Sequence, residues 1–549
     1  MLRTVSGSLI ILAVMKPPCD EAAIRSRDAT VPCHPASGGW VLSAAILASS
    51  MAFIDSTVVN VALPALQSSL NASVIDAQWV VESYGLFLGA LILVGGSVGD
   101  LLGRRRTFVA GVAAFAIASA WCGLAPTIHQ LVIARAFQGV GAAFLVPGSL
   151  AIISASFDQA ERGRAIGTWS GSTAMTTAVG PILGGWLIQH ASWRWAFFIN
   201  LPLAAAVIAI SLKHVPESRS TAAKRVDWLG AAIVTIGLGG LVFGLIESAR
   251  LGWTHPAVVA PLIIGGFCLL IFSFVEARVA APMVPLELFQ SRSFSVANLL
   301  TLFLYAAVGI FFFLFPLDLI QVQGYSATAA GAAALPAILL LFLLSRWSGG
   351  LVAGYGPRLP LIVGPLITAS GFVLFAIPAV GGSYWSTFFP AFVVLGFGMA
   401  ISVAPLTTVV MNAVDQDRAG TASGINNAVA RVAGLLAIAV LGIVMVRSFS
   451  TRLDRRLAPL PLSPDVRKNL ESNYIKLAAL KIPASLDSRT SAQIKASVDD
   501  AFVYGFRLVM LICAGLAVAS AVPAWLIEGK SGSGVSRPAT TSLSEPRPG

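Results

Sequence analysis

Two opposite charges, Asp55 and Arg135, stand inside long apolar segments, where each would be costly alone in hydrocarbon. Asp55 is eight residues from the outer end of segment 40–63, and Arg135 is eight residues beyond Thr127, where an opposite-running segment begins. At 1.5 Å per residue, both lie about 12 Å deep. A close Arg favours the charged carboxylate, so a pair that closes and opens could release and bind a proton. A static ion pair, or two residues on faces that never meet, remain alternatives.

A second carboxylate, Glu82, lies near the outer end of segment 77–98. An ionisable residue inside a membrane segment could titrate or bind a cation, so Glu82 joins Asp55 and Arg135 as a candidate proton-coupling group. A polar cap at the membrane surface explains Glu82 equally well.

Three further charges have simpler interpretations. Asp318, at the outer end of segment 294–318, is expected at the membrane interface. Arg346 and Arg431 are interpreted as lying near the inner ends of their segments, where a long side chain reaches the polar headgroups.

A glycine-bearing turn between segments 77–98 and 107–125 combines one acid with consecutive arginines. Glycines let helices approach closely, and the acid can pair with an Arg or with a helix N-terminus. A plain positive anchor would explain the arginines, but neither the acid nor the glycine spacing. We therefore expect a gating loop on the inner face, made by Gly96, Asp100, Gly103, Arg104 and Arg105.

Segment 165–188 is rich in glycine and contains one proline. Gly and Pro permit a bend and close helix contact, and the freed backbone groups must find partners on neighbouring helices. Any tightly packed span accumulates glycine, so packing alone is the alternative to a functional motif. The residues concerned are Gly167, Gly180, Pro181, Gly184 and Gly185.

The elements that position these residues are apolar segments of membrane-spanning length. Of the 549 residues, 56% are hydrophobic and 11% are charged, whereas soluble domains carry about 25% charged residues. A spanning helix needs about 20 mostly apolar residues. Fourteen segments qualify: 40–63, 77–98, 107–125, 128–155, 165–188, 197–212, 228–246, 257–275, 294–318, 330–350, 360–380, 385–411, 420–446 and 502–527.

The distribution of Lys and Arg gives the orientation. Most of them fall in alternate loops, which places these loops and both termini in the cytoplasm. Loop 447–500 is an exception, because it lies outside and has ten Lys and Arg, but it is long enough for the rule to weaken. We expect an all-α polytopic protein of the inner membrane, divided into a tail (1–39), a six-helix bundle (40–214), two linking helices (215–293), a second six-helix bundle (294–527) with periplasmic loop 447–500, and a tail (528–549).

The two bundles are weakly alike in sequence, and the start of the chain is ambiguous. A segment from Asp158 to Arg162 recurs as Asp415 to Arg418 before the corresponding span, as in transporters built from duplicated units. The apolar stretch after Met1 has no cleavage site, and Met15 is a second candidate start.

Three of these motifs resemble those of the major facilitator superfamily. The Gly96–Arg106 turn is similar to its loop motif, although Leu101 stands where the family usually has a basic residue. The segment Arg135–Ala143 resembles the fourth-span motif, whose Arg is linked to proton coupling. The pattern of Gly167 and Gly180–Gly185 resembles the antiporter motif, with Thr176 in place of one glycine.

Two further segments, Asp55–Pro64 and Trp193–Pro202, are similar to signatures of the fourteen-span drug:proton antiporter family. The resemblance covers residues 40–527 and implies the major facilitator fold, with two six-helix bundles plus two additional helices. It also implies proton-coupled antiport that exports small hydrophobic or cationic compounds by alternating access. A dedicated exporter of one endogenous lipid or metabolite would carry the same motifs.

Other classes of function have no support in the sequence. Five cysteines without paired spacing indicate no metal site, and we expect no cofactor. No nucleophile–base set or phosphate-binding loop indicates an enzyme. The net charge of +11 is scattered through loops, which disfavours a nucleic-acid partner. The expected partners are a small-molecule substrate, protons and the lipid bilayer; loop 447–500 could contact a periplasmic adaptor or be a solvated linker.

Overall fold

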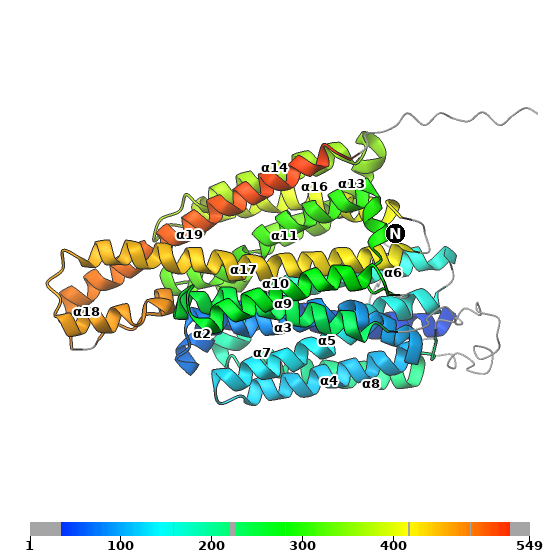
Figure 1. Cartoon of the computed structure of the whole chain (residues 1–549), viewed down its shortest axis with the longest axis horizontal. Coiled ribbons are helices and arrows are strands. Elements are labelled where there is room, and N and C mark those ends of the chain that lie inside the picture. The colour runs from blue at the N-terminus through cyan, green and yellow to red at the C-terminus, as the bar shows by residue number, and fades with distance from the viewer. Residues whose placement is uncertain are drawn as a thin grey trace, which may run out of the picture.

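The computed structural model describes residues 35–157, 159–219, 226–279, 282–414, 418–483 and 485–527. Within these ranges the regular elements are all helices (Figure 1). Met15, most of both predicted tails, and Asp158 and Asp415 of the recurring segment lie outside the described residues. The all-helical architecture predicted from the sequence is confirmed.

Thirteen of the described helices are long and apolar enough to cross a membrane. A further helix, α6 (Gln159–His190), has 32 residues but is too polar to be among them. It contains the predicted segment 165–188. With α6 included, the structure agrees with the fourteen spans expected.

The first bundle is built from seven helices, two of which together form one span. Side chains at the helix starts cap several of them; Ser73 and Asp76, for example, form a reciprocal capping box. The bundle comprises α2 (Pro35–Leu70), α3 (Val74–Leu102), α4 (Arg104–Leu124), α5 (Ile128–Ser156), α6, α7 (Trp195–Phe198) and α8 (Asn200–His214).

The second bundle is held by a cluster of phenylalanines. The rings of Phe311, Phe375 and Phe392 meet with centroids 4.7–6.0 Å apart, which is the range of favourable aromatic pairs. Its elements are η1 (Leu286–Gln290), α11 (Arg292–Leu317), η2 (Asp318–Val322), α12 (Ala327–Ala332), α13 (Leu335–Tyr355), α14 (Arg358–Phe375), α15 (Tyr384–Thr387), α16 (Phe389–Asn412), α17 (Ala419–Leu457) and α19 (Ser488–Ala524).

Two linking helices, α9 (Trp228–Leu251) and α10 (Pro256–Glu276), lie beside the seam between the bundles. Helix α9 packs on both α3 and α17, and α10 packs on α9 (Figure 1). Trp79 Nε1 donates to Glu247 Oε1 at 3.0 Å and ties α3 to α9. Large apolar side chains on α10, such as Leu270, are exposed and suit a lipid-facing surface. The pair therefore shields the α3–α17 seam from lipid.

The bundles are joined near one end, here called the outer end after the predicted orientation. Gln321 Nε2 donates to Gln67 Oε1 at 2.8 Å, and Thr328 Oγ1 donates to Gln189 Oε1 at 2.7 Å. Both bonds connect the first bundle to the second. The outer ends of the two halves are therefore sealed against each other.

Toward the inner end, α6 separates from the second bundle. Gly185, Gly171 and Gly167 share one face of α6, because they are four and five helical turns apart. A Cβ on Gly185 would overlap the backbone at Ala327, whereas one on Gly171 would find only Phe342 at 3.9 Å. A Cβ on Gly167 would have no described atom within 4 Å. The molecule is closed outside and open toward the inner end.

Residues 447–483 and 485–500 form a folded outer cap, not a solvated linker. Helices α17 and α19, with 39 and 37 residues, project beyond the other helices (Figure 1). Between them lie α18 (Pro464–Glu471) and η4 (Tyr474–Ala479). Phe449 and Tyr474 meet at 6.3 Å in the buried interior of the cap. The linker interpretation is therefore wrong.

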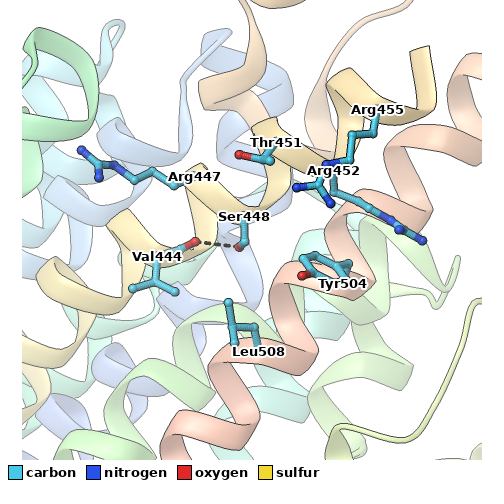
Figure 2. A pocket seen from close by; sticks show the side chains of 8 residues that line it. All are labelled: Val444, Arg447, Ser448, Thr451, Arg452, Arg455, Tyr504 and Leu508. Atoms are coloured by element: carbon cyan, nitrogen blue, oxygen red, sulfur yellow. Dashed lines mark hydrogen bonds between the residues drawn. The ribbon is translucent and has the colours of Figure 1, made fainter. Parts of the chain in front are cut away.

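Most positive charges described in the outer cap have structural partners. Arg452 and Arg456 each reach Asp500 at 2.8 Å, and Lys495 pairs with Asp499 at 2.6 Å. Figure 2 shows Arg452 beside a groove of about 320 Å³ that α17 shares with Leu508 of α19. These internal pairs give a structural reason for the exception to the charge rule.

We predict that Ser485→Cys reacts with a membrane-impermeant maleimide in intact spheroplasts. Ser485 is exposed on the outer cap, whose expected position is periplasmic. Arg219→Cys, exposed next to the inner turn, should react only after lysis. The unsubstituted protein gives the background from its own cysteines. Labelling of Ser485→Cys only after lysis would overturn the topology.

Candidate functional site

Asp55 and Arg135 form an ion pair between α2 and α5. Arg135 Nη1 lies 2.5 Å from Asp55 Oδ2, and the two side chains are 1% and 0% exposed. The sequence predicted the two charges at the same depth, and their contact follows because α2 packs directly on α5. The alternative that the two residues never meet is wrong. Whether the pair opens during function is a separate question, addressed below.

Three uncharged polar side chains complete the pair, which gives five groups in one buried network. Gln138 Nε2 donates to Asp55 Oδ1 at 2.8 Å, and Gln138 Oε1 accepts from Arg135 at 2.7 Å. Asn200 Nδ2 donates to Asp55 Oδ1 at 3.3 Å and to Ser119 Oγ at 3.0 Å. All are fully buried or nearly so. A charge pair away from water needs such additional bonds, because the pair alone does not offset desolvation.

Arg135 is also fixed by α3 and by aromatic rings. Its Nε donates to the carbonyl oxygen of Val80 at 3.0 Å, and its Cζ lies 4.1 Å from the ring centroid of Tyr84. Phe197 covers another side at 5.8 Å. A guanidinium over an aromatic face gains electrostatic attraction. The network is therefore closed to solvent, and any proton exchange requires the helices around it to move.

The sequence analysis missed Ser119, Gln138, Asn200 and Tyr84. Gln138 is one helical turn after Arg135, a spacing that places both on the same face of α5. That spacing was an available signal. Asn200 belongs to the segment Trp193–Pro202, which was noted without a role for the amide.

Glu82 is buried in the seam between the bundles, so its interpretation as a surface cap is wrong. It is 0% exposed, and neither carboxylate oxygen has a hydrogen-bond partner among the described residues. Gln78, one turn earlier on α3, donates to the carbonyl of Ile438 on α17 at 3.1 Å. By helical spacing Glu82 shares that face, while Val80 and Tyr84 face Arg135 on the opposite side. The structure does not bring Glu82 to the Asp55–Arg135 pair.

Two other expectations about charged residues need correction. Asp318 is 2% exposed, in a π-helical turn, with Oδ1 unpartnered among the described residues, so it does not face the interface. Arg431 is 12 residues inside α17, about 18 Å from the start of the helix, which is too deep to reach the headgroups. The side chain of Arg346 lies outside the description.

The predicted gating loop forms a compact ion-pair turn at the inner end. Asp100 pairs with Arg104 at 2.8 Å, four residues on, while Leu101 is exposed. Gly96, one turn before Asp100, would bring a Cβ to 3.8 Å from Pro147 of α5, an ordinary contact. The acid thus finds an Arg even though the residue after it is not basic.

Glu217 is a member of this loop that the sequence analysis missed. Its two oxygens accept from the backbone N–H groups of Arg105 and Arg106 at 3.0 and 3.2 Å, at the start of α4. A carboxylate at a helix N-terminus is favourable. Gly103 has φ +119°, and a Cβ there would meet Glu217 Oε1 at 2.7 Å. Glycine is therefore required for this docking, which ties the turn to the end of α8.

Asp100→Asn is predicted to slow transport more than it weakens substrate binding. The substitution removes one charge of an inner ion pair and leaves the buried network intact, so the maximal efflux rate should fall about threefold to tenfold, as for other gating residues. Efflux rate against substrate concentration measures this. Glu287→Gln, which breaks an exposed inner pair with Arg418, is the control and should change neither quantity. Unchanged efflux by Asp100→Asn would leave the turn as a topology signal only.

The glycines predicted as an antiporter motif pack against two different neighbours. Cβ atoms on Gly180 and Gly184 would lie 2.6 Å from Thr57 and 2.5 Å from Val58 on α2. Gly185 meets α12, and the carbonyl of Pro181 faces Gly331 of α12. Gly167, by contrast, faces the inner opening. The outer part of the motif is thus a three-helix contact among α2, α6 and α12, next to the seal between the bundles.

Comparison with known proteins gives a consistent family assignment. The family model described as Major Facilitator Superfamily matches residues 45–438. The chain is 35% identical to "Multidrug resistance protein Stp" of Mycobacterium tuberculosis over 413 residues, which are 74% of this chain and 76% of that protein. It is 31% identical to "Tetracenomycin C resistance and export protein" of Streptomyces glaucescens over 506 residues, 89% and 92% of the two chains.

A solved structure shares the fold. A bacterial homologue of the human lysosomal transporter Spinster, in an inward-facing and unoccupied conformation, superposes with a TM-score of 0.61 at 17% identity. The match covers 90% of this chain and 98% of that one. At this identity the match supports the fold alone.

Proposed function

Because this chain belongs to the Major Facilitator Superfamily and is a multi-pass inner-membrane transporter of the drug-efflux type, not an enzyme, we propose that it is a proton-coupled antiporter. It exports small hydrophobic or cationic compounds and admits protons by alternating access. The observation that carries the proposal is a buried carboxylate, Asp55, held by Arg135 within a network that has no contact with solvent. A carboxylate in this position is a proton carrier whose access must be controlled by helix movement.

In the present conformation the pair is closed. Asp55 receives N–H groups from Arg135, Gln138 and Asn200, and these donors favour its charged form. If α5 moves relative to α2 when the bundles rock, Arg135 leaves and Asp55 becomes a charge without its partner. Binding a proton then removes the cost of that charge. When the pair closes again, the proton is displaced.

Direction follows from which state exposes the pair. A proton taken from the outside when the outer seal is open, and released to the inside when the pair closes, moves down its gradient. The substrate must leave during the outward-open phase, which requires the Gly185–α12 contact to separate. The coupling is thus between one ion pair in the first bundle and one seal between the bundles.

Glu82 is proposed as a second coupling group. It lies on the α17 face of α3 without a described hydrogen-bond partner, so its charged form has little compensation in this conformation. Rocking changes the α3–α17 seam and can admit water or a cation to Glu82. The Asp55 pair and Glu82 would then respond to the same movement from opposite faces of α3.

A dedicated exporter of one compound is the second candidate. It is favoured by the long match to a protein named for the resistance to and export of a single compound, which covers 89% of this chain. The two candidates differ in breadth. A panel of unrelated neutral and cationic fluorescent compounds should all be expelled by the multidrug type, and one chemical class at most by the dedicated type.

The test of proton coupling uses the same panel in cells that contain or lack the protein. Efflux should require the protein and should stop when a protonophore is added while the ATP level is kept constant. The converse measurement uses everted vesicles, where an exported compound should release part of an imposed proton gradient. Efflux that continues unchanged with the protonophore would reject the proposal.

A further inference from the structure

Arg431 sits in the seam between the bundles, at the middle of α17. Its Cβ lies 3.6 Å from the position that a Cβ on Gly89 of α3 would take. One turn further out, Leu435 packs on Gly85 of α3. The absence of a side chain at Gly89 therefore makes room for a long cation at the centre of the molecule.

The position of Arg431 is where the seam changes from closed to open. Outward from it, Leu435 and Ile438 are buried. Inward from it, Asn427 is exposed and Gly424 is partly exposed. Since α6 also separates from the second bundle toward the inner end, Arg431 lies at the closed end of an opening that faces the cytoplasm.

The guanidinium of Arg431 has no ion pair or hydrogen bond with any described residue. It is partly exposed, and its nitrogens are not among the buried polar atoms, so they face the opening. Tyr84 is close enough for the two groups to interact electrostatically, and the Tyr84 hydroxyl is buried without a described partner. Arg135 differs completely, because its network is satisfied.

Two unused donors therefore converge at one place. An Arg inside a membrane protein costs about 2.5–3.5 kcal/mol or more unless it meets a partner or water. A guanidinium and a phenol are a suitable pair of donors for a carboxylate or another oxyanion. A cation at this position would meet a like charge.

We propose that Arg431, assisted by Tyr84, binds an ionised acidic group of the exported compound in the inward-open state. The inference rests on the proposed export function and narrows its substrate class to hydrophobic compounds that carry a carboxylate or a comparable oxyanion. Helix α3 supplies the phenol and α17 supplies the guanidinium, so the bound acid joins the two bundles. Substrate binding then acts directly on the seam that must move.

Glu82 is the competing partner, since it lies in the same seam further out. In this conformation no interaction connects it to Arg431 among those described. If the role of Arg431 were only to meet Glu82 in another conformation, the protein would show no preference for acidic ligands.

The test is equilibrium binding to the purified full-length protein without a proton gradient. Three fluorescent probes share one ring system and differ in charge: 1-pyrenebutyrate, its methyl ester, and pyrenebutyl-trimethylammonium. We expect the unsubstituted protein to bind the carboxylate about tenfold to a hundredfold more tightly than the ester, as for a charge-assisted hydrogen bond. Arg431→Gln should remove this difference, and Arg431→Lys should keep part of it.

Arg447→Gln is the matched control, because Arg447 is on the same helix but beside the outer groove (Figure 2). It should leave the preference intact. Equal binding of carboxylate and ester by the unsubstituted protein, preference for the ammonium probe, no binding of the carboxylate, or a preference that survives in Arg431→Gln would each overturn the proposal. The comparison among probes needs no variant, and a failure of proton coupling in cells would not change it.

Discussion

Asp55→Asn is expected to abolish protonophore-sensitive efflux, with at least a hundredfold loss of the coupled rate, since a buried ionisable carrier has no uncharged substitute. Asn keeps the shape and can still accept from Gln138 and Asn200, which now donate to Asp55 Oδ1. It cannot bind and release a proton. The measurement is dye efflux with and without protonophore, normalised to the amount of protein in the membrane.

Stability must be separated from coupling in this variant. Removing one member of a buried pair leaves Arg135 uncompensated, which costs about 3–5 kcal/mol. The double variant Asp55→Asn with Arg135→Gln removes both charges and should recover expression without recovering coupling. Asp55→Glu keeps the titratable group and should retain part of the activity. Normal proton-driven efflux by Asp55→Asn would exclude Asp55, and Glu82 would become the first candidate.

Gly185→Val is expected to prevent closure of the outer seal and to reduce transport at least tenfold. A Cβ at Gly185 already overlaps the α12 backbone at Ala327, and two further methyl groups cannot be accommodated without displacing α12. The inward-open conformation would then be disfavoured relative to the outward-open one. The protein should still fold, because the contact joins two bundles and not the interior of either.

Accessibility at the outer end measures this effect directly. Gln67→Cys, placed on a side chain that is 3% exposed at the seal, should be protected in the otherwise unchanged protein. Combined with Gly185→Val, it should react rapidly with an impermeant thiol reagent. Gly266→Val on α10 is the control, because no described atom lies within 4 Å of the Cβ position. Continued protection together with normal transport in Gly185→Val would show that α12 adapts without opening the seal.

The charged pair was predictable, because its signal is one-dimensional. Apolar length gives depth, and two charges at equal depth on opposite-running helices have a physical reason to meet. Ser119, Gln138 and Asn200 carry no such signal. They belong to α4, α5 and α8, and only the packing of these helices around α2 brings their side chains to one carboxylate.

Arg431 shows where the same argument fails. Its depth was judged as near the inner end of the segment, but α17 begins at Ala419 and places Arg431 about 18 Å along the helix. Glu82 failed for a related reason, since nearness to a helix end does not predict exposure when the linking helices cover the seam. The interhelical surroundings of a charge cannot be obtained from its distance along one helix.

The outer cap was missed because composition was used in place of periodicity. Residues 447–500 contain many charged residues, which is typical of a solvated loop. The apolar residues Phe449, Leu453 and Leu457, however, continue the buried face of α17 at helical spacing. That pattern predicts a helix that continues beyond the membrane.

The polarity of α6 has a consequence for how the chain enters the membrane during synthesis. A nascent segment partitions from the translocon into lipid according to its own apolar character, and α6 falls short of the other thirteen spans. Its polar groups find their partners on α2, as Trp169 does by donating to Ser49 at 3.0 Å. Helix α2 is already synthesised when α6 emerges. Integration of α6 should therefore be cooperative with α2, and α6 alone between two soluble reporters should be translocated instead of retained.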